Sequence, residues 1–156
     1  MNDGLRHVTV AMLRESLTLA EQRQLPAFSS EDGGESYAEA WLQERVRQAC
    51  DRVVAALNTC SHNTAIKSGM CRVPAACVKT ALVLARQDVL AAVPGMAETL
   101  EGGTRSAEYS TAVQELNALA SCHLIPDYKL TEEELATGGE CGMTVRFGEK
   151  ASDWVF

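Results

Sequence analysis

Apolar residues recur with a helical period over most of this chain. From residue 36 to residue 59 they are spaced three or four positions apart, which is typical of one buried face of a helix. Residues 74–93 are apolar on nearly every face and carry few charges. A helix that is apolar all round must be covered on several sides, so we expect residues 74–93 to lie at the centre of a bundle. A third apolar stripe predicts a helix over residues 105–124, which Pro126 closes.

The N-terminal residues 3–24 also carry a wide apolar stripe, and they predict a helix that Pro26 ends. Residues 7–10 alternate between polar and apolar side chains, so the start of this segment is also compatible with a strand. Ser36 and Glu39 have the spacing of a capping box, in which a hydroxyl and a carboxylate satisfy free amides of the first turn. This box predicts the start of the first long helix.

Residues 61–72 contain Gly69 and have no periodicity, so they predict a loop between the first two long helices. Pro74 suits the first turn of the next helix, where its missing amide hydrogen costs nothing. Pro94 and Gly95 are expected to end that helix.

The C-terminal part of the chain predicts shorter elements. Thr131 and Glu134 have the spacing of a second capping box, which predicts a compact helix start that ends near Gly138. Residues 143–156 alternate weakly around a turn and are compatible with a small β-hairpin packed on the helices. The expected fold is therefore mainly α: a four- to five-helix bundle, in one helical domain over residues 1–156, with a small C-terminal hairpin as the added element.

Composition agrees with a helical fold. Of the 156 residues 46% are hydrophobic, 22% are charged and only 5% are aromatic, so the core must be aliphatic. No apolar run approaches the roughly 18 residues that cross a bilayer. The N-terminus lacks a basic region followed by an apolar run and a cleavage site. We therefore expect no membrane span and a cytoplasmic location.

The net charge of −7 is unevenly distributed along the chain. Residues 45–86 carry seven basic side chains and Asp51 as their one acid, whereas the residues on either side are neutral or acidic. This basic stretch predicts a surface for an anion or a partner. Nucleic acid is disfavoured as that partner because such binders are usually basic overall, and the alternative is that basic and acidic helices neutralise each other. The candidate surface residues are Arg45, Arg52, Lys67, Arg72 and Lys79.

Four of the six cysteines, Cys50, Cys60, Cys71 and Cys77, lie in the predicted hairpin of helices. Cys50 and Cys60 are spaced as in one half of a twin C-x9-C helical hairpin, a disulfide motif of the mitochondrial intermembrane space, but only five residues separate Cys71 from Cys77. In an antiparallel hairpin Cys60 would lie near Cys71, and Cys50 within about one turn of Cys77. Two disulfides in an oxidising compartment such as that space, reactive thiols, and reduced cysteines buried as small apolar side chains all remain open.

Metal and thiol chemistry are weakly indicated. The cysteines with His62 and His123 are suitable zinc ligands, but no C-x2-C pair is present and no spacing matches a known ligand pattern. We therefore expect no cofactor, with zinc as the exception to test. A nucleophilic cysteine would need a base such as His62 beside it, and nothing in the sequence brings the two together.

The sequence thus favours a non-enzymatic protein that binds another protein, as an adaptor, an assembly or regulatory factor, or a small subunit of a larger complex, with homo-oligomers as a further option. Amphipathic helices, segregated charge and the lack of a catalytic motif support this hypothesis. The alternative is a small enzyme or ligand-binding protein with a thiol or metal site between helices near Cys71, Cys77 and His62.

Overall fold

The computed structural model describes residues 4–28, 35–93 and 103–135. It is mainly helical, which confirms the prediction of a mainly α fold, and it includes a small two-stranded antiparallel sheet. None of the helices in these three ranges is both long and apolar enough to cross a bilayer. The α-helices within them are α1 (Val10–Glu15), α2 (Leu19–Phe28), α3 (Glu35–Thr59), α4 (Val78–Ala92) and α5 (Gly103–Ala120).

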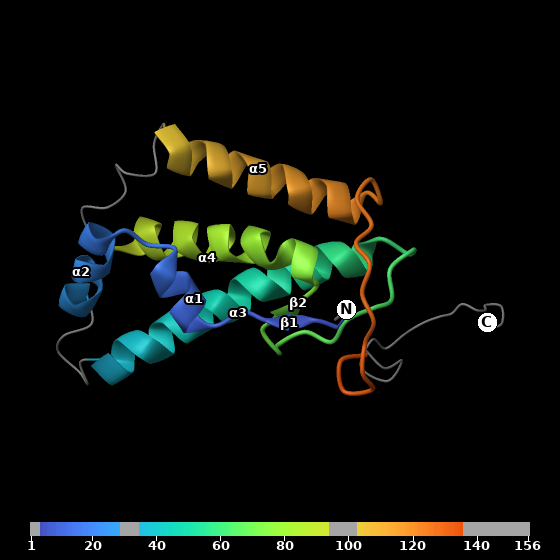
Figure 1. Ribbon diagram of the computed structural model, residues 1–156, viewed down its shortest axis with the longest axis horizontal. Coiled ribbons are helices and arrows are strands. Elements are labelled where there is room, and N and C mark those ends of the chain that lie inside the picture. Colours follow the sequence, from blue (N-terminus) through green and yellow to red (C-terminus); the bar gives the residue numbers. More distant parts are fainter. Residues whose placement is uncertain (1–3, 29–34, 94–102, 136–156) are drawn as a thin grey trace.

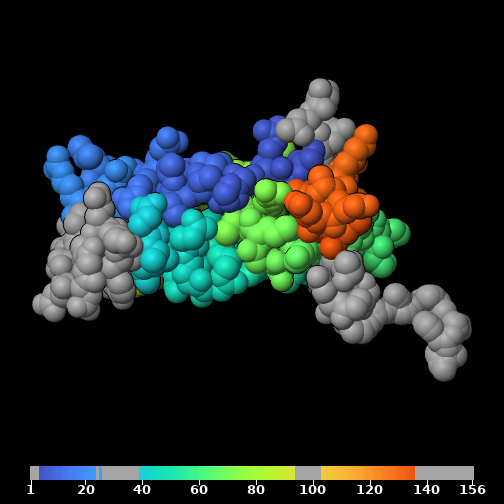
Figure 2. Space-filling model, turned by 90° about the horizontal axis from the view of Figure 1, so that it is seen from below, coloured from blue at the N-terminus to red at the C-terminus, as the bar shows by residue number. Residues whose placement is uncertain are grey.

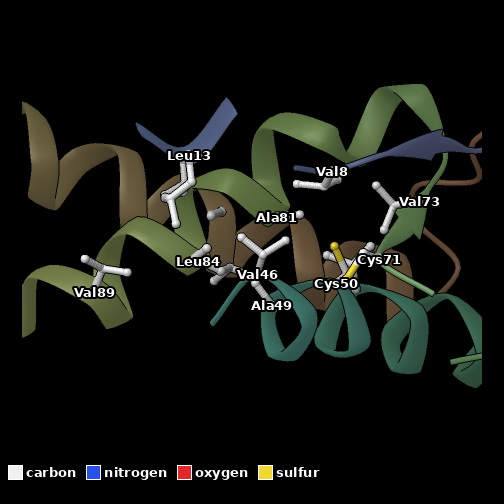
Figure 3. Packing of buried hydrophobic residues seen from close by; sticks show 14 of the residues in the cluster. Val8, Leu13, Val46, Ala49, Cys50, Cys71, Val73, Ala81, Leu84 and Val89 are labelled. Atoms are coloured by element: carbon white, nitrogen blue, oxygen red, sulfur yellow. The ribbon is translucent and has the colours of Figure 1, made fainter. Parts of the chain in front are cut away.

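The three longest helices, α3, α4 and α5, pack against one another in pairs (Figure 1). Pro74 precedes a short 3-10 helix, Ala75–Cys77, which leads directly into α4. Buried residues occur on several faces of α4, as expected for a central helix: they are Thr80, Ala81, Val83, Leu84, Ala85, Arg86, Val89 and Leu90. Figure 3 shows how side chains of α3 and α4 meet in this core.

The N-terminal segment is divided into three elements instead of the one helix that its apolar stripe predicts. Strand β1 (Arg6–His7) pairs antiparallel with β2 (Arg72–Val73), so the segment does begin as a strand, but His7 is the one residue of the alternating stretch 7–10 that belongs to it. Helix α1 follows, and the Thr9 side chain accepts a hydrogen bond of 3.2 Å from the Met12 amide at its start.

A second helix start divides α1 from α2. The Thr18 amide donates to the Glu21 carboxylate at 2.8 Å, and the Glu21 amide donates to the Thr18 hydroxyl at 3.2 Å. This is a complete capping box, and it starts α2 afresh after the turn at Ser16. The prediction of one continuous helix is wrong because this local box competes with the apolar stripe. Helix α2 also continues two residues past Pro26, since a proline in the last turn removes only one hydrogen bond.

The bounds of the long helices lie close to those that the sequence predicts. Residues 36–59 were expected for α3, residues 74–93 for the region of α4, and residues 105–124 for α5. Helix α5 ends earlier because Cys122 adopts a left-handed conformation, with φ of 65°, and turns the chain away. The amides of His123 and Leu124 then donate back to the Ala118 carbonyl at 2.9 and 3.1 Å.

Two predictions at the C-terminal side have different outcomes. Residues 132–134 form a turn instead of a helix, although the Glu134 carboxylate does accept a hydrogen bond of 3.0 Å from the Thr131 amide. The hairpin expected over residues 143–156 lies outside the described residues, as does the side chain of Ser36 in the first capping box.

Candidate functional site

After α5 the chain crosses one end of the helices as an extended segment, residues 121–135, which we call the strap (Figure 1). The strap lies against the loop between α3 and β2, residues 60–71, as the orange and green atoms of Figure 2 show. The Tyr128 hydroxyl donates to the Thr64 carbonyl at 2.7 Å, and the Lys67 amide donates to the Glu134 carbonyl at 2.8 Å. An antiparallel bridge between Ile66 and Leu135 adds backbone pairing.

A disulfide between Cys60 and Cys122 joins this loop to the strap, and their Cα atoms are 5.3 Å apart. A disulfide between Cys60 and Cys71, one of the alternatives that the sequence left open, is therefore ruled out. The true partner of Cys60 lies 62 residues further along the chain, at the end of α5, because α5 packs on α3 and brings the two helix ends together. The disulfide is compatible with an oxidising compartment.

An ion pair also ties the strap to the sheet. Glu134 is only 4% exposed, and its carboxylate lies 3.2 Å from the guanidinium of Arg72 in β2. The other oxygen of Glu134 accepts from the Thr131 amide. A buried carboxylate needs such partners, and Arg72, whose side chain is itself 42% exposed, is one of them.

The five basic candidate residues occupy three separate places. Arg45 and Arg52 lie on α3, where both act on the half-buried carboxyl of Asp88 in α4, and Arg45 also stacks over the Trp41 ring at 5.5 Å. Lys67 and Arg72 both lie beside Glu134 at the strap. Lys79 is exposed on α4, at the edge of α5. The structure therefore does not gather them into one surface.

The remaining cysteines of the described residues, Cys50, Cys71 and Cys77, are free and buried. Burial is the main cause that raises the pKa of all three thiols, to about 12 for Cys50 and about 11 for Cys77. A thiol nucleophile needs the opposite shift, toward neutral pH. His62 is exposed in the loop.

Metal ligands do not converge within residues 4–28, 35–93 and 103–135: no group of three or more His, Cys, Asp or Glu side chains there could hold an ion. Cys60 and Cys122 are bonded to each other, and the His123 ring shares a hydrogen bond of 2.8 Å with the Ser121 hydroxyl. Cys141, the sixth cysteine of the chain, lies outside the described residues.

A cavity of about 200 Å³ lies between α4 and α5, away from the site expected near Cys71, Cys77 and His62. Two polar contacts cross this interface: the Thr80 hydroxyl donates to Glu115, and the Arg86 guanidinium pairs with Glu108. The residues that line the cavity are Lys79, Thr80, Val83, Thr104, Ala107, Glu108, Thr111, Ala112 and Glu115.

Large exposed apolar side chains are concentrated on the strap. Leu124 is 42% exposed, its neighbour Ile125 is 51% exposed, and Leu135 is 36% exposed at the other end of the strap. Leu19, which is 64% exposed, is on α2 instead. This surface was not predicted from the sequence, because the apolar stripe predicts a helix that continues to residue 124. The end of the helix is marked by the conformation and disulfide of Cys122, which the stripe does not show.

Comparison of the chain with family models, with curated proteins and with solved structures finds no match. The class of this protein therefore rests on its own structure: a mainly helical protein whose strap is fixed by a disulfide.

Proposed function

We propose that this is a non-enzymatic binding protein that engages a protein partner through the exposed apolar residues of the strap. The observation that carries the proposal is the adjacent pair Leu124 and Ile125, both more than two-fifths exposed, which begins two residues after the disulfide-bonded Cys122. Exposed apolar side chains next to each other favour contact with another apolar surface.

The attachment of the strap strengthens this proposal. A disulfide, the Tyr128 and Lys67 hydrogen bonds and the buried Glu134 carboxylate fix the strap before any partner arrives. Association with a segment that is already ordered loses less conformational entropy than association with a free loop. A fixed strap can therefore present Leu124 and Ile125 in one arrangement.

The alternative functions have less support. The raised pKa values of Cys50, Cys71 and Cys77 disfavour a thiol enzyme. The cavity between α4 and α5, at about 200 Å³, is smaller than the roughly 300–1,000 Å³ of typical ligand pockets. Two of its carboxylates, Glu108 and Glu115, are already paired with Arg86 and Thr80.

The compartment that fits this proposal is an oxidising one. Disulfides persist outside the reducing cytosol, so the Cys60–Cys122 bond favours the alternative location over the cytoplasm. Within that compartment the partner would be another protein with an apolar surface. A second copy of this chain carries such a surface and is therefore one candidate partner.

Substitution of Ile125 by glutamate tests the proposal, with Leu19→Glu as the matched control. Both residues are exposed, so neither change should unfold the protein, but only Ile125 lies on the strap. Tagged wild-type protein is incubated without reductant in extract from its own cells, cross-linked and recovered, and sedimentation of the purified protein reports self-association.

We expect Leu19→Glu to retain the partner and Ile125→Glu to lose most of it, since a buried charge at an apolar contact costs several kcal/mol. If self-association is the function, Leu19→Glu should sediment as the same oligomer as wild type, whereas Ile125→Glu should sediment as a smaller species. Equal capture by wild type and Ile125→Glu, together with unchanged sedimentation, would overturn the proposal.

A further inference from the structure

Cys50 and Cys71 bring two free thiols together in the core from different parts of the chain. Cys50 is on α3 and Cys71 is the last residue before β2, and they are 1% and 6% exposed. Figure 3 shows their sulfur atoms side by side. Burial, and next the neighbouring Cys71 thiol, raise the pKa of Cys50, so the two groups also interact electrostatically.

Contacts of Cys71 with α3 support this placement. The Gln43 side-chain amide donates to the Cys71 sulfur at 3.3 Å. Gln43 precedes Cys50 by seven residues, which is two helical turns on the same face. Arg47 lies on that face between them and also acts on the Cys71 thiol. The Cys71 side chain therefore lies against the face of α3 that carries Cys50.

The backbone of Cys71 resembles that of the cysteine that is already bonded. Cys71 has φ of 56° and Cys122 has φ of 65°, and these are the two non-glycine residues with positive φ in the described parts of the chain. A left-handed conformation costs roughly 1–3 kcal/mol at such a residue and persists only where surrounding contacts impose it. At Cys71 these contacts include the Val8 amide, which donates to its carbonyl at 2.8 Å.

We propose that Cys50 and Cys71 form a second intramolecular disulfide when the protein meets a small disulfide oxidant such as oxidised glutathione. This inference does not depend on the proposed binding function. Burial raises the pKa of both thiols, but Cys71 is the more exposed residue, at 6% against 1%, and the hydrogen bond that its sulfur accepts from Gln43 partly offsets the rise in its pKa. Cys71 is therefore the first of the two thiols to react, at a rate that its raised pKa keeps slow.

The reaction proceeds in two exchange steps. The Cys71 thiolate attacks the disulfide of oxidised glutathione, forms a mixed disulfide and releases one glutathione as the leaving thiolate. Cys50 then loses its proton to water and attacks the Cys71 sulfur, which forms the Cys50–Cys71 bond and releases the second glutathione. Two protein thiols are oxidised, and one glutathione disulfide is reduced to two thiols.

The new bond would fix the start of β2 to the middle of α3. Because β2 pairs with β1, and the Val8 amide bonds to Cys71, the N-terminal strand would be held through the same residue. We expect oxidation to raise the melting temperature by roughly 6–12 °C, as for a closed loop of about 20 residues in a chain of this size.

Peptide mapping of the wild-type protein tests the proposal directly. The protein is purified with Cys60–Cys122 intact, incubated with oxidised glutathione, alkylated in denaturant and digested without reduction. We expect a cross-linked peptide pair that joins Cys50 to Cys71, together with the rise in melting temperature. The mapping uses unmodified protein, so it does not depend on whether any variant folds.

Cys77→Ala provides the matched control, since Cys77 is a buried free thiol, at 3% exposure, that is not part of the pair. This variant should retain both the cross-linked peptide and the melting shift, whereas Cys50→Ala and Cys71→Ala should lose both. Recovery of Cys50 and Cys71 as alkylated thiols, as a stable glutathione adduct, or in a bond from Cys71 to Cys77 would show that the proposal is wrong.

Discussion

Helices α4 and α5 lie side by side and are similar in length, but different interactions hold them in the protein. Helix α4 buries residues on several faces, whereas α5 buries only Ala112 and Leu119 among its described side chains. Helix α5, which buries fewer apolar side chains, is held by several polar contacts as well. Arg105 pairs with Glu21 of α2 at 2.7 Å, and Glu108 and Glu115 bond to Arg86 and Thr80 of α4.

The C-terminal end of α5 also has a covalent attachment, the Cys60–Cys122 bond. Burial of apolar surface is not directional, so it tolerates small shifts, whereas ion pairs and a disulfide fix one arrangement. Helix α4 therefore supplies much of the buried core, while α5 and the strap are positioned by specific bonds. Four experiments test this difference between the two helices.

Removal of the disulfide should have the largest effect. Replacing both Cys60 and Cys122 by serine opens a loop of 62 residues, and we expect the free energy of unfolding to fall by about 4 kcal/mol. Urea unfolding measures this loss, with Cys77→Ser as the control for a cysteine outside the bond. A loss below about 1 kcal/mol would mean that noncovalent contacts alone position the end of α5.

Truncation of one leucine on each helix tests the difference in burial. Leu84 of α4 is fully buried, and Leu84→Ala should cost about 3 kcal/mol, from lost burial and a residual cavity. Leu116 of α5 is only half-buried, and Leu116→Ala should cost about 1 kcal/mol. Equal losses in urea unfolding would contradict the view that the two helices are held differently.

The ion pair between Glu21 and Arg105 should have a smaller effect. The Glu21 side chain is 6% exposed and that of Arg105 is 19% exposed, so solvent screens the pair little. A double-mutant cycle with Glu21→Gln and Arg105→Met should give a coupling energy of about 2 kcal/mol.

The exposed pair between Arg14 and Glu39 is the control for this cycle. Its side chains are 34% and 56% exposed, and its coupling should stay below about 0.5 kcal/mol. Similar couplings for the two pairs would show that the polar contacts of α5 do not position it more strongly than a surface ion pair does.

The smallest effect should come from Asp88, a carboxylate of α4 that lies near Arg45 and Arg52 of α3. Burial raises the pKa of its carboxyl, and Arg52 and Arg45 only partly offset this. Because the folded pKa exceeds the unfolded one, the stabilisation from Asp88 is present below the unfolded pKa and is lost as the pH rises through the folded pKa.

Asp88→Asn removes this titration. We therefore expect the variant to gain stability relative to wild type as the pH rises from about 3.5 to about 6.5, which urea unfolding at the two pH values can measure. A difference in stability that is the same at both pH values would show that Asp88 titrates as an ordinary surface carboxyl.

The long helices could be predicted from the sequence because their signals are local. The stripe from Leu42 to Leu57 and the nearly unbroken apolar pattern around Leu84 depend only on residues a few positions apart. The break between α1 and α2 was missed, although Thr18 and Glu21 have capping-box spacing, because the apolar stripe runs across both helices.

Contacts between distant residues could not be predicted in the same way. A pairing of Cys60 with Cys71 was one alternative because the two are close in sequence, but a disulfide requires closeness in space. The candidate basic residues were grouped because they are close in sequence, and the structure places Arg45, Arg72 and Lys79 beside different partners.

The amino-acid pattern is enough to predict that this protein is mainly helical and that the helix containing Leu84 is buried, because periodicity and composition specify which faces avoid water. Only the packing of distant segments explains why Cys60 bonds to Cys122, why Cys50 meets Cys71 and why Leu124 and Ile125 stay exposed. The disulfide and the exposed strap depend on how α5 packs on α3, whereas the meeting of Cys50 and Cys71 depends on how the chain before β2 returns to α3. No pattern within a single helix specifies either arrangement.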